Sequence, residues 1–175
     1  MTAPSAPASD ELLQLATFEV GSDLLAVDIM RIREISRALP VTPVPRSPHG
    51  MVGVIDVRGQ ILPLFDLRVR FDLPPRTSAD EGFVRHLVIR LDGKLLAIVV
   101  DRMHDVVTVP RSGIRAGQGT LVGEAADVFV GVVTLGDRLA LLLNLRRVIT
   151  KEDRIALASL SFGAGASPLG RSARS

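Results

Sequence analysis

The sequence contains no cysteine, no tryptophan and no tyrosine, and its only aromatic side chains are six phenylalanines. The absence of cysteine excludes disulfides, thiolate zinc sites, iron–sulfur ligation and thiol nucleophiles. Without Tyr or Trp, the chain has no ring that combines an apolar body with a polar tip, so its core has to be built mostly from aliphatic side chains. A cysteine-free composition is also typical of a reducing compartment, and we therefore expect a cytoplasmic protein.

Lysine is nearly absent as well, because only Lys94 and Lys151 stand among 21 basic residues and the others are arginine. The net charge is only +2. The pI of about 9.9 follows because almost no group titrates between neutrality and arginine. Acidic and basic residues are mixed throughout residues 12–150, and this pattern lacks the one-sided basic stripe that binds a phosphate backbone.

Long hydrophobic runs are missing too. The longest apolar stretches, at 95–100 and 139–143, have strand length and fall short of the roughly 18 residues of a membrane span. No secretory signal opens the chain, so we expect no direct membrane insertion. Composition divides the chain into a disordered N-terminal tail (1–11), a folded body (12–150), and a helix end with a flexible tail (151–175).

Alternation of apolar and polar residues, broken by turn residues, predicts a series of β-hairpins in the body. The Asp-Gly pair at 92–93 is a strong signal for a two-residue turn, and we interpret Arg58-Gly59 as another. The predicted hairpins pair 12–20 with 24–27, 53–57 with 60–67, 83–91 with 95–109, and 128–135 with 138–145.

Two local features modify this pattern. Pro63 lies inside a predicted strand, which indicates an edge strand or a bulge, because proline cannot donate a hydrogen bond to a ladder. Ile29, Ile32 and Ile35 recur at helical spacing, which predicts a short helix with Asp28 as its N-cap.

The same order of elements occurs twice. Residues 20–35 align without gaps on 91–106, and residues 53–68 align without gaps on 131–146. A β unit of about 70 residues is marginally stable alone, and two such units gain stability by burying a face against each other. We therefore expect two related β units with a groove between them.

No motif predicts catalysis, a metal site or a cofactor. His49, His86 and His104 lack metal-ligand spacing, and neither a Walker motif nor a nucleophile elbow is present. Asp66 and Asp101 end apolar strands, so a hydrolase built on either carboxylate is one alternative, with strand-end capping as the commoner role.

A small β-barrel that binds nucleic acid is the second alternative. Such a protein needs a basic groove interleaved with aromatic side chains. Here the phenylalanines stand in apolar contexts typical of a core, namely Phe18, Phe65, Phe71, Phe83 and Phe129. We therefore expect no nucleic-acid partner.

The segment GVIDVRGQILPLFDLRVRF (53–71) resembles the signature of the CheW family of bacterial chemotaxis coupling proteins. That signature consists of Gly-Val, an Asn-Leu-Arg-Gly turn, an apolar strand with proline, and Asp-Leu-Arg. Segments 18–35, 87–109 and 130–149 resemble the rest of the family pattern in order, so the resemblance covers the whole body. Asp56-Val57 replaces the usual Asn-Leu and adds a charge before the turn.

The resemblance implies a mainly β fold with short helices, made of two packed five-stranded β barrels of the SH3-like type. It also implies a non-catalytic adaptor without a cofactor. Such an adaptor binds the cytoplasmic tip of a methyl-accepting chemoreceptor and the regulatory domain of a CheA-type histidine kinase. Its expected location is the cytoplasm, at membrane-associated receptor arrays that it reaches through these partners.

Carried over position by position, the receptor surface includes Ile32, Glu34, Gly53 and Arg58. Because a receptor tip is a helical hairpin that can lay an apolar stripe in a groove, we add Ile35 and Met103 as groove-lining residues. Alternative roles stay open: Ile35 and Met103 in the inter-barrel core, Arg58 in the hairpin turn, and Gly53 in backbone packing. The kinase surface is expected at a barrel end and is not assigned to residues.

Overall fold

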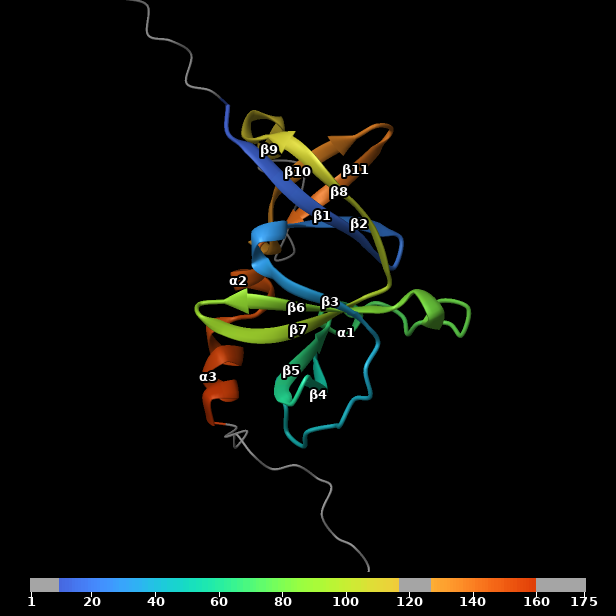
Figure 1. The fold of residues 1–175 in the computed structure, drawn as a ribbon, viewed down its shortest axis with the longest axis vertical. Coiled ribbons are helices and arrows are strands. Elements are labelled where there is room, and N and C mark those ends of the chain that lie inside the picture. Colours follow the sequence, from blue (N-terminus) through green and yellow to red (C-terminus); the bar gives the residue numbers. More distant parts are fainter. Residues whose placement is uncertain (1–9, 117–126, 160–175) are drawn as a thin grey trace, which may run out of the picture.

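The computed structural model describes residues 10–116 and 127–159, which fold into two stacked β units (Figure 1). The upper sheet, barrel 1, has the strand order β8-β1-β2-β11-β10-β9, and the lower sheet, barrel 2, has the order β3-β6-β7-β5-β4. Barrel 1 consists of β1 (Leu12–Val20), β2 (Asp23–Asp28), β8 (Arg102–Pro110), β9 (Ile114–Ala116), β10 (Phe129–Leu135) and β11 (Arg138–Leu143). Barrel 2 consists of β3 (Ile32–Arg37), β4 (Met51–Val57), β5 (Gln60–Asp66), β6 (Arg85–Leu91) and β7 (Lys94–Val100).

The helices of the described residues are short. They are the 3-10 turns η1 (Ile29–Arg31), η2 (Glu81–Phe83) and η3 (Arg111–Gly113), and the α-helices α1 (Leu67–Arg70), α2 (Leu145–Val148) and α3 (Lys151–Ser159). None of them has the length and apolar character needed to cross a membrane. The predicted fold class, mainly β with two packed barrels, is confirmed, and barrel 1 carries the three-residue β9 as a sixth strand.

The internal repeat explains the topology. Strands β1, β2 and β3 correspond to β6, β7 and β8, and the hairpin β4–β5 corresponds to β10–β11. Under this correspondence the two strand orders become identical apart from β9. The first two strands of each half lie in one sheet and its remaining strands lie in the other, so neither half of the sequence closes a barrel by itself.

The exchanged strands give the barrels a shared core. Its largest cluster joins Phe18 of barrel 1 to Phe65, Leu87 and Ile98 of barrel 2, all fully buried. Each barrel also holds a smaller cluster of its own. Because apolar burial contributes about 25 cal/mol per Å², this common cluster couples the two barrels energetically.

Three predictions about strands need correction. The helix expected at Ile29–Ile35 ends after η1, although Asp28 does cap it by accepting a hydrogen bond from the Met30 N–H at 2.9 Å. From Ile32 the chain pairs with β6 as β3, because this pairing satisfies the backbone and suits β-branched isoleucine. The single strand expected at 95–109 breaks at Asp101, where the chain passes from barrel 2 to barrel 1.

The third correction concerns Pro63. Strand β5 is not an edge strand, because it lies between β4 and β7. Its parallel pairing with β7 begins only at Leu64, so the missing N–H of Pro63 removes no bond from that ladder. The register shift in the β4–β5 pair lies near Gly53 and not at Pro63.

Helix α3 begins with reciprocal capping. The Thr150 N–H donates to Asp153 Oδ2 at 2.8 Å, and the Asp153 N–H donates to Thr150 Oγ1 at 3.2 Å. We expect Thr150→Ala to lower the free energy of unfolding by about 1 kcal/mol, which urea titration followed by circular dichroism will measure. Thr150→Ser keeps the hydroxyl and should restore most of the loss; equal losses in both variants would contradict the capping role.

The expected tails lie mainly at 1–9 and 160–175, outside the described residues. The boundaries at residues 11 and 150 stay predictions.

Candidate functional site

The six residues expected at the receptor surface come from three strands and one turn. Strand β3 carries Ile32, Glu34 and Ile35, β4 and its turn carry Gly53 and Arg58, and β8 carries Met103. Strands β3 and β8 lie at sheet edges and are equivalent in the internal repeat. The expected surface therefore draws on equivalent edge strands, one from each barrel.

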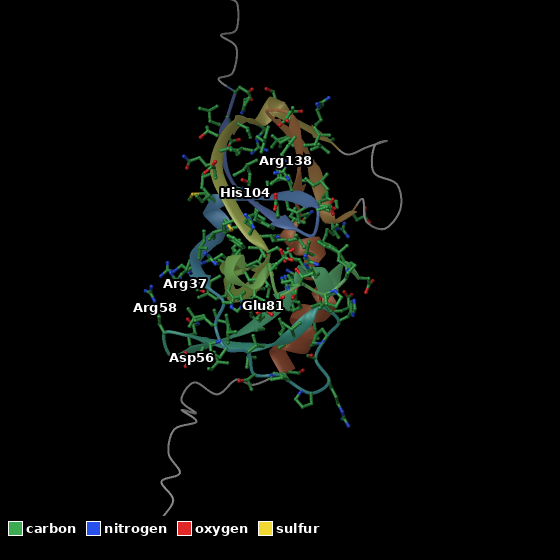
Figure 2. All side chains as sticks on the ribbon, turned by 90° about the vertical axis from the view of Figure 1, so that its right-hand side faces the viewer. Arg37, Asp56, Arg58, Glu81, His104 and Arg138 are labelled. Atoms are coloured by element: carbon green, nitrogen blue, oxygen red, sulfur yellow. The ribbon has the colours of Figure 1, made fainter. Side chains whose placement is uncertain are left out.

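Glu34 and Arg58 are brought into direct contact. Arg58 Nη2 lies 3.2 Å from Glu34 Oε1, although the Arg58 side chain is 82% exposed. The turn is held by other groups: Asp56 Oδ1 accepts a hydrogen bond from the Gly59 N–H at 2.7 Å, and Arg58 and Gly59 both adopt positive φ. Figure 2 shows Arg58 on the same outward side of barrel 2 as Arg37, with His104 above them on barrel 1.

The apolar members differ in exposure. Ile35 is 46% exposed, whereas Ile32 and Met103 are partly buried against the shared core. Met103 lies opposite Phe18 in the β8–β1 pair. Ile35 is therefore accessible to a partner, while Ile32 and Met103 also pack on the core, as one of the alternatives for Met103 expected.

Val106 is an exposed apolar residue that sequence reasoning missed. It is 48% exposed on β8 and corresponds to Ile35 in the internal repeat. The gapless alignment of 20–35 on 91–106 contained the signal, because it pairs Glu34-Ile35 with Asp105-Val106.

Gly53 is not brought to this surface. It is buried with φ +150°, and a Cβ there would lie 2.3 Å from the Thr42 carbonyl oxygen. Gly131, its counterpart in the repeat, has the same close approach to the Arg115 carbonyl oxygen at 2.5 Å. In both strands, the backbone of a neighbouring segment lies so close to the glycine that no side chain fits there.

Asp66 and Asp101 lie in a buried ionic cluster that we call the junction cluster, formed with Arg68 and Arg76. Asp101 Oδ2 accepts from the Gly21 N–H at 2.6 Å and from Arg68 Nε at 2.9 Å, and its Oδ1 accepts from Arg76 Nε at 2.5 Å. Asp66 accepts from both terminal nitrogens of Arg76. These contacts argue against a hydrolytic role, since each carboxylate oxygen already has a donor.

The charges of the junction cluster reinforce one another. Burial opposes ionisation of Asp101, but hydrogen bonds from Arg68 and Gly21 and the charge of Arg76 hold its pKa below 3.8. Burial likewise disfavours the charged form of Arg76, yet its contacts with Asp66 and Asp101 raise its pKa above the usual value. Asp101 and Arg76 are therefore both charged near neutrality.

His86, Phe18 and Phe65 are buried, whereas Phe83 is exposed. Burial lowers the pKa of His86, whose Nδ1 accepts a hydrogen bond from the Leu39 N–H. Within 10–116 and 127–159, no three acidic or histidine side chains gather as a metal site would require. Phe18 and Phe65 are buried as expected, but Phe83 is 46% exposed, with the Arg102 guanidinium 3.7 Å from its ring centroid.

Comparison with known proteins identifies the family. The family model described as the CheW-like domain matches residues 14–153. The chain is 29% identical to the chemotaxis protein CheW of Treponema pallidum, covering 87% of this chain and 91% of the relative. It is 31% identical to the CheW of Rhizobium meliloti, over 82% of this chain and 91% of the relative.

Two further relatives agree. The protein FrzA of Myxococcus xanthus is 32% identical, covering 81% of this chain and 88% of the relative. The crystal structure of the scaffolding protein TtCheW from Thermoanaerobacter tengcongensis superimposes with a TM-score of 0.72 at 22% identity, covering 82% of this chain and 96% of that one. With the family model matching most of its length, this chain belongs to the family of CheW-like domain proteins.

Proposed function

We propose that this chain is a non-catalytic chemotaxis adaptor that couples chemoreceptor cytoplasmic tips to the regulatory domain of a CheA-type histidine kinase. The observation that carries the proposal is the pair of equivalent edge strands, β3 and β8. It combines exposed Ile35 and Val106 with the Glu34–Arg58 ion pair. Membership of the CheW-like family supports the same role. The site of action is the cytoplasmic face of receptor arrays, which the chain reaches through its partners.

The chemistry of the surface fits a helical hairpin. An amphipathic helix packs its apolar stripe against apolar side chains, here Ile35 and Val106, and polar rim groups set its register. Glu34 and Arg58 supply one acceptor group and one donor group at that rim. If receptor binding changes the affinity of this chain for the kinase by some factor, kinase binding changes its affinity for the receptor by the same factor.

Ile35→Asp should weaken binding of a soluble receptor-tip fragment at least tenfold, and Arg58→Ala about fivefold, as expected for residues of an interface centre and rim. Both side chains are largely outside the core, so thermal unfolding should change little. Ile32→Asp is a poorer test because Ile32 packs on the shared core. The measurement is isothermal titration calorimetry.

Matched controls lie on barrel 1. Leu12 is 67% exposed, and Arg111 forms a single surface ion pair with Glu11. Leu12→Asp and Arg111→Ala therefore make the same kinds of substitution away from the six predicted receptor-surface residues. Receptor affinity within twofold of wild type in Ile35→Asp or Arg58→Ala would remove that residue from the surface. Equal losses in the controls would show a non-specific effect.

Kinase coupling is tested by calorimetric titration with the regulatory domain of a CheA-type kinase from the same genome. We expect saturable one-to-one binding. Absence of binding to every such kinase of that genome would overturn the coupling role. A gel shift whose affinity falls steeply with salt would then favour the nucleic-acid alternative.

A further inference from the structure

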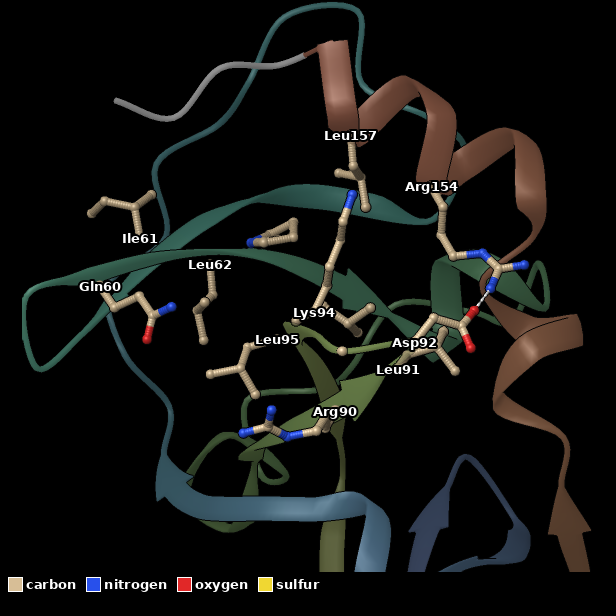
Figure 3. A pocket seen from close by; sticks show the side chains of 13 residues that line it. Gln60, Ile61, Leu62, Arg90, Leu91, Asp92, Lys94, Leu95, Arg154 and Leu157 are labelled. Carbon is tan, nitrogen blue, oxygen red and sulfur yellow. Dashed lines mark hydrogen bonds and ion pairs between the residues drawn. The ribbon is translucent and has the colours of Figure 1, made fainter. Parts of the chain in front are cut away.

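A hollow of about 750 Å³ opens at one end of barrel 2, where β5 and β7 separate (Figure 3). The two strands pair only between Leu64–Asp66 and Ala97–Val99. Their first halves line the hollow instead, and α3 supplies a further wall with Leu157 and Arg154. Between these first halves no ladder is formed, so each strand has an unpaired edge facing the hollow.

The hollow combines an apolar floor with a positive rim. Ile61, Leu62, Leu95 and Leu157 contribute to the floor. The single acidic residue of the lining is Asp92, and two arginines neutralise it: Arg154, and Arg146 at 2.9 Å.

Arg90 and Lys94 provide the uncompensated charge of the rim. Both line the hollow, as Figure 3 shows, and within the described part of the chain neither forms an ion pair. A bound molecule that places negative charge near Arg90 and Lys94 is therefore favoured over a neutral one.

Comparison with barrel 1 shows that this charge is not a consequence of the fold. In the internal repeat, Arg90 corresponds to Glu19 and Lys94 corresponds to Asp23. Asp23 lines the equivalent hollow of barrel 1, which measures about 410 Å³ and is also lined by Phe71 and Leu73. At these two equivalent positions, barrel 1 has acidic residues and barrel 2 has basic residues.

We propose that the barrel-2 hollow docks a short extended segment of a partner protein whose apolar side chains are flanked by Asp or Glu. The apolar side chains fill the floor, the carboxylates pair with Arg90 and Lys94, and the backbone adds to the free edge of β5 or β7. A small amphipathic anion would use the floor and the cations but not the strand edges. None of the six receptor-surface residues lines this hollow, so the site is separate from the proposed receptor contact.

The test uses the full chain and a labelled nine-residue peptide with a Val-Thr-Leu-Thr-Val core between two glutamates on each side. Fluorescence anisotropy measures its affinity, and amide NMR shifts locate it. We expect shifts on β5 and β7, and about tenfold weaker binding after the double reversal R90E and K94E. The same core flanked by lysines should bind more weakly to wild type than to that double variant.

The matched control is the double reversal R111E and R115E on barrel 1, which changes net charge equally and should alter affinity less than twofold. Equal weakening by both double reversals would overturn the proposal, as would shifts confined to other strands or no peptide binding. If decanoate displaces the labelled peptide and binds more tightly than the peptide does, the hollow is instead a site for a small amphipathic anion. K94Q, which removes charge without reversing it, should give an intermediate loss if the variants fold equally.

Discussion

Asp101→Ala lowers the free energy of unfolding by about 3–5 kcal/mol, the expected result of removing one member of a buried ion network. The substitution removes a counter-ion of Arg68 and Arg76. Their side chains are only 13% and 16% exposed, so water does not replace it well. The substitution also removes the acceptor of the Gly21 N–H, which belongs to the β1–β2 turn of barrel 1. Asp101 therefore joins the barrels at the point where β7 ends and β8 begins. Urea unfolding followed by circular dichroism measures the loss, since the chain has no tryptophan to report it.

Asp92→Asn is the matched control, because asparagine removes the charge and, unlike alanine, tolerates the positive φ of Asp92 in its turn. Asp92 also binds two arginines, Arg146 and Arg154, but its side chain is 37% exposed, so water replaces the lost partner. Its loss should stay below about 1 kcal/mol. Similar losses for the two variants would contradict the assignment of the junction cluster as a structural link between the barrels.

The pKa of Asp101 adds a pH dependence to this prediction. Burial opposes its ionisation, but its contacts with Arg68, Gly21 and Arg76 hold the folded-state pKa below the usual 3.8. The stabilisation is therefore present above about pH 4 and is lost as the pH falls through the folded-state pKa. Asp101→Asn should flatten the fall in unfolding free energy below about pH 4 relative to wild type. An unchanged slope would show that other carboxylates control acid unfolding.

The hairpins were predictable because their signals are local. Asp92-Gly93 and Arg58-Gly59 both adopt the positive φ values that a two-residue hairpin turn requires. The segment after Asp28 was misread because isoleucines at helical spacing can also alternate along a strand with a bulge, which the structure has between Ile32 and Glu34. Only the tertiary pairing with β6 decides between the two.

The junction cluster was not predictable, because its members are far apart in sequence. Arg76 lies outside all of the predicted hairpins, and its partner Asp101 follows 25 residues later. Sequence reasoning considered Asp101 only as a strand-end carboxylate. Val106, the exposed counterpart of Ile35 in the repeat, was predictable because the alignment pairs the two positions. The outward position of Ile35 required the structure.

Gly53→Ala is expected to lower the free energy of unfolding by about 3 kcal/mol, from backbone strain and overpacking together. Its φ of +150° disfavours any side chain, and the added Cβ would lie 2.3 Å from the Thr42 carbonyl oxygen and 2.8 Å from Val41 Cγ1. That carbonyl accepts a backbone hydrogen bond from Val54 at 2.9 Å, so it cannot withdraw without breaking the bridge. Urea unfolding measures the loss.

Gly59→Ala separates the two contributions. Gly59 has φ +85° with no atom near the position of a Cβ, so its variant bears only the strain of positive φ, about 1–2 kcal/mol. The comparison also decides how Gly53 relates to the receptor surface. If Gly53→Ala loses stability and receptor affinity together, the glycine positions β4 and the turn that carries Arg58. If it keeps wild-type stability and loses receptor affinity alone, the partner contacts Gly53 directly, and the close approach to Thr42 is not what requires glycine there.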